Sequence, residues 1–108
     1  MKEKQLAVIK HFGMDHQRRK LEEEVLELQE AIIEYSIVRN IYAIQKDESE
    51  KARKHLTKLR RHIVEEMADV NNLLGQFKLA FHITDEELNT VLTSKVNRTY
   101  ALIPGKDE

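Results

Sequence analysis

Two pairs of acidic residues, each pair three residues apart, are the part of this sequence best suited to chemistry. Glu24 and Glu27 lie in one strongly helical stretch, and Glu66 and Asp69 lie in another. Both pairs fall at the margin of an apolar helix face, where an ionised carboxylate without a partner is costly. If the two helices pack face to face, four carboxylates meet. Oxygen ligands of this kind suit hard cations, so the spacing predicts a Mg²⁺ site that could also take Mn²⁺.

Each of the two helices that must position these carboxylates carries apolar residues at helical spacing. In the first helix this stripe comprises Leu21, Val25, Leu28, Ile32 and Tyr35. In the second helix it comprises Ile63, Met67, Val70, Leu74, Phe77 and Phe81. We therefore expect two long helices that bury these stripes against each other and hold the acidic pairs at one edge.

A single acidic pair at this spacing is ordinary on a solvated helix, where Glu pairs with Lys or Arg. Two such pairs, both at an apolar margin and both flanked by further carboxylates, favour the metal site instead. Other chemistry is excluded by residue type. The chain has no Cys and no glycine-rich phosphate loop, and none of its five histidines follows a Glu by three residues.

The composition indicates one small all-α domain. The chain has 108 residues, 34% of them charged, with one Pro and three Gly. A formal net charge of −1 gives no general attraction to nucleic acid, and the basic segment at 51–61 reads as a solvated helix face. We expect no nucleic acid polymer and no membrane as partner. Because no stretch resembles a signal peptide or a membrane span, the expected location is the cytoplasm.

Four helices are expected, over Lys2–Phe12, His16–Lys46, Lys51–Phe81 and Asp85–Tyr100. Gly13 is expected to end the first helix and Asp15 to cap the second. Asp47 or Ser49 can cap the third helix, and Thr84 with Glu87 forms a capping box for the last. These elements predict a four-helix bundle with two long antiparallel helices, over a single domain at 1–103, followed by a short polar tail at 104–108.

A second apolar stripe on the first long helix needs a further partner. It comprises Leu26, Ile33, Ile37 and Ile44. Either the short first helix covers it or it is a subunit interface, and a chain this short favours a homodimer or homotetramer. The last helix is expected to turn its apolar residues inward, namely Leu88, Val91, Leu92 and Val96. Gly75 either allows close helix approach or is a tolerated accident.

The acidic boxes also carry a family resemblance. The segments at 17–28 (QRRKLEEEVLEL), 65–70 (EEMADV) and 95–98 (KVNR) resemble the MazG-like all-α nucleoside triphosphate pyrophosphohydrolases. The resemblance covers about residues 11–98, although the segment 28–65 is longer than in compact members. It implies that Glu24, Glu27, Glu66 and Asp69 bind Mg²⁺. It also implies cleavage of a nucleoside or deoxynucleoside triphosphate between the α and β phosphorus atoms, giving the monophosphate and pyrophosphate, in a bundle completed by oligomerisation.

Several residues near the boxes could take part in that reaction. Glu23, or another carboxylate of the cluster, could accept the proton of the attacking water. Lys20, Lys95 and Arg98 are candidates for binding phosphate oxygens. Lys20 could equally form an ion pair with Glu24, and the other two could simply be favourable charges at a helix C-terminus.

His11, Phe12 and His16 lie just ahead of the first acidic box and could approach a base. Two readings compete with a hydrolase. One is a non-enzymatic helical interaction protein whose acidic pairs are a solvated margin. The other is a metal-binding regulatory relative without turnover.

Overall fold

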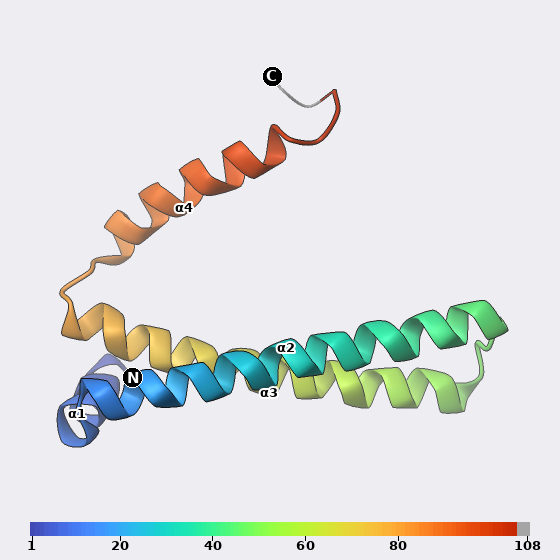
Figure 1. Cartoon of the computed structure of the whole chain (residues 1–108), viewed down its shortest axis with the longest axis horizontal. Coiled ribbons are helices and arrows are strands. Elements are labelled where there is room, and N and C mark those ends of the chain that lie inside the picture. Colours follow the sequence, from blue (N-terminus) through green and yellow to red (C-terminus); the bar gives the residue numbers. More distant parts are fainter. Residues whose placement is uncertain (106–108) are drawn as a thin grey trace.

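The computed structural model describes residues 1–105, and within them every regular element is a helix (Figure 1). The helices are α1 (Lys2–Phe12), α2 (Met14–Gln45), α3 (Glu50–Ala80) and α4 (Asp85–Tyr100). The all-α prediction is confirmed, with helix ends within two residues of those expected. Of the predicted polar tail, 104 and 105 lie in a turn after α4, and 106–108 lie outside the described residues.

Local sequence signals explain where the helices begin. The Ser49 hydroxyl accepts a hydrogen bond from the Ala52 amide at the start of α3, and the Thr84 hydroxyl accepts one from the Glu87 amide at the start of α4. Asp15 is not the cap expected for α2. That helix begins directly after Gly13, whose φ of 89° is a conformation that glycine adopts without strain.

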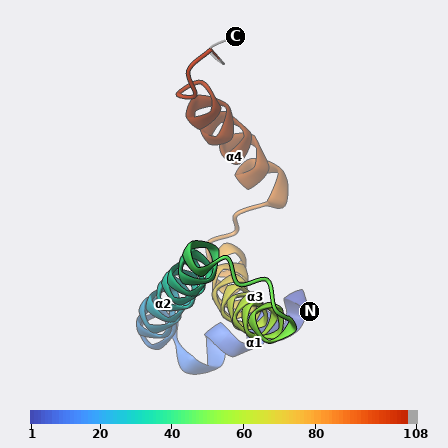
Figure 2. The same cartoon turned by 90° about the vertical axis from the view of Figure 1, so that its right-hand side faces the viewer.

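Helices α2 and α3 form a long antiparallel hairpin with a narrow seam (Figures 1 and 2). Along the seam, α2 contributes buried and half-buried residues at alternating spacings of three and four: Gln17, Leu21, Glu24, Leu28, Ala31, Tyr35, Val38 and Tyr42. The seam residues of α3 follow the same rule: Ala52, Leu56, Leu59, Ile63, Glu66, Val70, Leu73 and Phe77. Outside this spacing, Ser36 is half-buried, and so is the C-terminal part of α3, where Gln76 is buried and Gly75, Lys78, Leu79 and Ala80 are half-buried. A mean period of 3.5 residues is that of a two-helix coiled coil.

This seam corrects the predicted apolar stripes. Val25 and Ile32 remain 45% and 41% exposed, and Met67, Leu74 and Phe81 are exposed as well. A helical wheel at 100° per residue accepts a broad apolar arc, whereas a two-helix seam buries only a narrow strip. These five residues flank the seam on one side, and polar and acidic residues flank it on the other.

The second apolar stripe of α2 is not covered by α1, so that alternative is wrong. Leu26, Ile33, Ile37 and Ile44 are each about half exposed or more. Helix α1 instead packs against the C-terminal part of α3 and the start of α2, where Ile9 is buried. In Figure 2, α1 lies below the hairpin and α4 lies above it.

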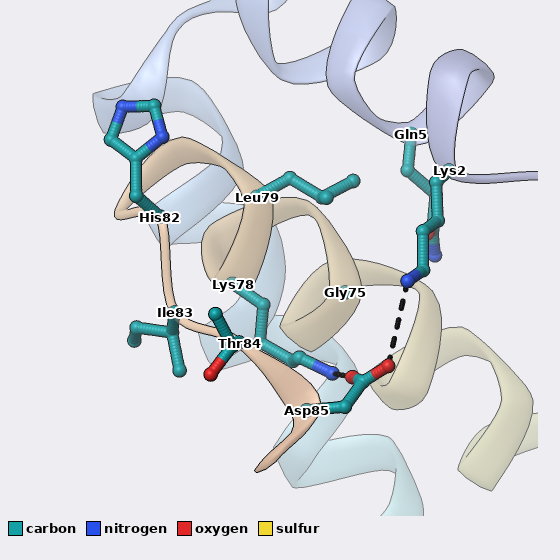
Figure 3. A pocket seen from close by; sticks show the side chains of 9 residues that line it. All are labelled: Lys2, Gln5, Gly75, Lys78, Leu79, His82, Ile83, Thr84 and Asp85. Carbon is teal, nitrogen blue, oxygen red and sulfur yellow. Dashed lines mark hydrogen bonds and ion pairs between the residues drawn. The ribbon is translucent and has the colours of Figure 1, made fainter. Parts of the chain in front are cut away.

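Helix α4 does not pack against the other helices of its own chain (Figure 1). Its apolar residues Leu88, Val91, Leu92 and Val96 are 44% to 56% exposed, which corrects the expectation that they turn inward. The helix is held only at its first residue, where Asp85 forms ion pairs with Lys2 and Lys78 beside a cavity of about 420 Å³ (Figure 3). The predicted bundle is thus incomplete within one chain.

Gly75 lies where α1 approaches α3. A Cβ built on it would come within 2.5 Å of the Gln5 side-chain amide, which donates a hydrogen bond to the backbone carbonyl of Asn72. Because the Gln5 amide is the far end of a flexible side chain, it can move aside. We expect Gly75→Ala to change the free energy of unfolding by less than about 0.5 kcal/mol, since the gain in helix propensity offsets the lost hydrogen bond. Urea unfolding measures this, and a loss above about 2 kcal/mol would show that the close approach is required.

Candidate functional site

Three of the four predicted metal ligands meet across the hairpin. Glu24 of α2 and Glu66 and Asp69 of α3 each offer a carboxylate oxygen, and these oxygens all lie within 4.8 Å of one another. We call these three residues the acidic triad. Glu24 and Glu66 are 8% and 9% exposed, whereas Asp69 is exposed. The triad therefore combines two buried carboxylates with one side that is open to solvent.

The two buried carboxylates are incompletely partnered. Lys20 Nζ lies 3.7 Å from Glu24 Oε1, and His62 Nδ1 lies 3.9 Å from Glu66 Oε1. The second oxygen of each carboxylate, Oε2, is buried and has no hydrogen-bond partner. Buried polar atoms are normally satisfied, and unpartnered carboxylate oxygens cost the most. A divalent cation bound between them would remove that cost, so the donor set fits Mg²⁺ or Mn²⁺.

Glu27, the fourth predicted ligand, lies at the edge of this group. Its charge repels Glu24, but its oxygens fall outside the compact set formed by the triad. It also lines an adjoining cavity of about 370 Å³. The residues around that cavity are Glu27, Glu30, Ala31, Glu34, His62 and Glu66. A polyanion could enter so acidic a cavity only together with cations.

Burial raises the pKa of Glu24 above its ordinary value of 4.5, and the negative charges of Glu27 and Asp69 raise it further, against the lowering effect of Lys20. The charged form of Glu24 is thus disfavoured in the folded protein. Because a cation would reverse this, protons and a bound metal would compete at Glu24.

The raised pKa predicts how stability depends on pH when chelator is present. An acid with a higher pKa in the folded state destabilises the fold as the pH rises from 4.5 through that folded value. We expect the wild type to lose more stability than Glu24→Gln over this rise, and saturating Mg²⁺ to reverse the sign of the difference, because the metal displaces the proton from Glu24. Thermal melts of both proteins at several pH values test this. Identical pH profiles in chelator would contradict it.

The remaining predicted residues are divided between the triad and α4. Lys20 is half exposed and contacts both Glu24 and Glu23, the latter at 3.9 Å, so the ion pair weighed from the sequence is present. Glu23 points outward and is 65% exposed at its side chain. Lys95 and Arg98 lie on α4, which does not pack against the hairpin of its own chain.

Sequence reasoning missed a network of buried amides that adjoins the triad. Gln17 and Gln76 are 5% and 1% exposed, and Gln17 Nε2 donates to Gln76 Oε1 at 2.8 Å. Gln76 in turn donates to Asn72, one turn beyond Asp69. The 3.5-residue seam period could have found Gln17, because it places this residue seven before Glu24 in the buried strip, but it does not find Gln76.

Comparisons of the chain with protein-family models, with curated proteins and with solved structures gave no match. Among the described residues, none of the helices is both long enough and apolar enough to cross a membrane.

Proposed function

We propose that this protein is a Mg²⁺-dependent nucleoside or deoxynucleoside triphosphate pyrophosphohydrolase. The observation that carries the proposal is the pair of buried carboxylate oxygens, on Glu24 and Glu66, that have no hydrogen-bond partner and converge with Asp69. They belong to the two acidic boxes whose sequence resembles the MazG-like family. A metal site built from oxygen donors alone and open to solvent on one side suits an anionic substrate that arrives with its own Mg²⁺.

Each residue of the site would have its own role in the reaction. Glu24, Glu66 and Asp69, with Glu27 beside them, would hold Mg²⁺, which screens phosphate charge and lowers the pKa of a bound water. Glu23 would accept the proton of the water that attacks the α-phosphorus, because its carboxylate is exposed next to the triad. Bond formation from this water oxygen breaks the bond to the β-phosphate, so that pyrophosphate leaves.

Lys20 is the cation of this chain that already lies at the triad. With a cation held at Glu24, the Lys20 ammonium would be released from its ion pair and could bind a phosphate oxygen. Lys95 and Arg98 are assigned the same task only through oligomerisation, since within one chain their helix does not pack on the hairpin. The exposed apolar residues of α2 and α4 favour a homodimer or homotetramer. The proposed location is the cytoplasm.

The direct test is release of pyrophosphate from a panel of canonical and modified NTPs and dNTPs, with Mg²⁺ and with chelator. We expect metal-dependent release with the monophosphate as co-product. Release of inorganic phosphate alone would overturn the assigned bond cleavage. No release from folded, oligomeric protein would favour an interaction protein or a regulatory metal-binding protein, for which the exposed apolar face of α2 would be the working surface.

A further inference from the structure

Three aromatic rings lie together at the junction of α1 and α2. The Phe12 ring stacks on the His16 ring, with centroids 5.1 Å apart and planes inclined by 20°. His11 meets Phe12 edge-on at 4.8 Å. Phe12 remains 52% exposed and His16 is exposed, so this pair presents aromatic surface to solvent rather than filling the core.

The buried amide network fixes the orientation of His16. Gln76 Nε2 donates to Asn72, and Gln76 Oε1 accepts from Gln17 Nε2, so the Gln17 oxygen is left as an acceptor. His16 Nδ1 lies 2.6 Å from that oxygen and must therefore be the donor. Because Gln17 and Gln76 are both buried and are joined by a hydrogen bond between α2 and α3, the Gln17 oxygen has a fixed position, and the imidazole that donates to it is held with it. The exposed His16 ring therefore has a fixed orientation, which an ordinary surface histidine does not have.

The ring pair and the acidic triad are connected by one strip of the α2 surface. At 100° per residue, His16, Lys20, Glu23 and Glu27 project in similar directions. The rise from His16 to Glu24 is about 12 Å at 1.5 Å per residue. Lys20 lies between them and contacts the triad. The strip thus presents an aromatic surface, a cation and a metal-binding group in that order.

We propose that Phe12 and His16 form the base-binding platform of this protein, so that a nucleotide lies along α2 with its base stacked on these rings and its phosphates at Lys20 and the triad. This inference rests on the proposed function, since it names how the same substrate is held. Stacking on an aromatic face is available to every nucleobase. The platform therefore recognises the presence of a planar base and discriminates little among bases.

The test compares a ligand that has a base with one that has only phosphates. Binding of a non-hydrolysable α,β-imido dATP and of inorganic tripolyphosphate is measured by calorimetry with Mg²⁺. For Phe12→Leu and for His16→Ala we expect the analogue to bind at least about tenfold more weakly, with tripolyphosphate affinity unchanged. Tyr100→Leu, at a ring that is likewise 52% exposed but lies on α4, is the control and should leave analogue affinity unchanged.

The outcomes separate the two proposals. Wild-type protein that binds the analogue no more tightly than tripolyphosphate overturns the platform and leaves the proposed function standing. Equal loss of both ligands in Phe12→Leu and His16→Ala also overturns it, because the rings would then be holding the fold rather than the base. If neither ligand binds wild-type protein with Mg²⁺, the proposed function fails and the platform fails with it. Retention of analogue binding by Phe12→Tyr, which keeps the stacking face, supports the base-binding platform.

Discussion

Replacing Glu66 by Gln is expected to lower Mg²⁺-dependent pyrophosphate release by at least about 100-fold. The substitution keeps the size of the side chain but removes one of the two buried anionic oxygens of the triad. Steady-state rates across a Mg²⁺ titration measure the effect. Glu65→Gln is the matched control, because Glu65 is adjacent in sequence and 66% exposed at its side chain, and it should retain activity within about twofold.

Although Glu66→Gln is expected to lower activity, it should stabilise the fold when no metal is bound. In chelator the buried Glu66 carboxylate has an unpartnered oxygen, so Glu66→Gln is expected to raise the free energy of unfolding by roughly 1 kcal/mol. With saturating Mg²⁺ the wild type should become the more stable of the two proteins, since only the wild type gains free energy from binding the metal. Loss of activity together with loss of the fold in both conditions would make Glu66 a structural residue. Full activity in Glu66→Gln would show that the site assignment is wrong.

The sequence was sufficient to predict the helices and the meeting of the acidic boxes. Ser49, Thr84 and Gly13 act locally, so their effects on helix ends can be read without knowing the tertiary structure. Glu24 and Glu66 could be placed together because each lies at the margin of the apolar stripe through which its helix was expected to pack against the other long helix.

The sequence did not predict which residues of each apolar stripe are buried, because burial depends on small differences in direction around the helix and on helices that pack from outside the stripe. Val25 and Leu28 lie about 60° apart around the helix, yet only Leu28 enters the seam, because a contact between two helices buries only a narrow strip of each. Gln17 and Gln76 are of a residue type that is usually exposed, and their burial follows only from how the helices pack. Leu92 reads as core, and the chain alone gives it nothing to pack against.

A charge placed on the apolar face of α2 is expected to dissociate the proposed oligomer. Ile37 is 54% exposed in the single chain, within the stripe that includes Ile33 and Ile44. Burying an Asp at this position in an interface costs several kcal/mol, so Ile37→Asp should weaken self-association by at least about 100-fold. Sedimentation equilibrium over a range of protein concentrations measures this. Gln45→Glu adds the same charge at an exposed position on the polar side of the same helix, about 80° around the helix axis from Ile37, and should leave the assembly intact.

Helix α4 supplies an independent readout of that dissociation. A 16-residue helix without packing partners is marginally stable in water, so α4 needs a covering surface to persist. If a second copy provides this surface, amide hydrogens of α4 should exchange slowly in the wild type and rapidly in Ile37→Asp, while those of the α2–α3 seam change little. A wild type that remains monomeric at about 100 μM, where interfaces of only modest affinity are already occupied, would contradict the proposed oligomer. Slow exchange of α4 in such a monomer would show that α4 folds back onto its own hairpin.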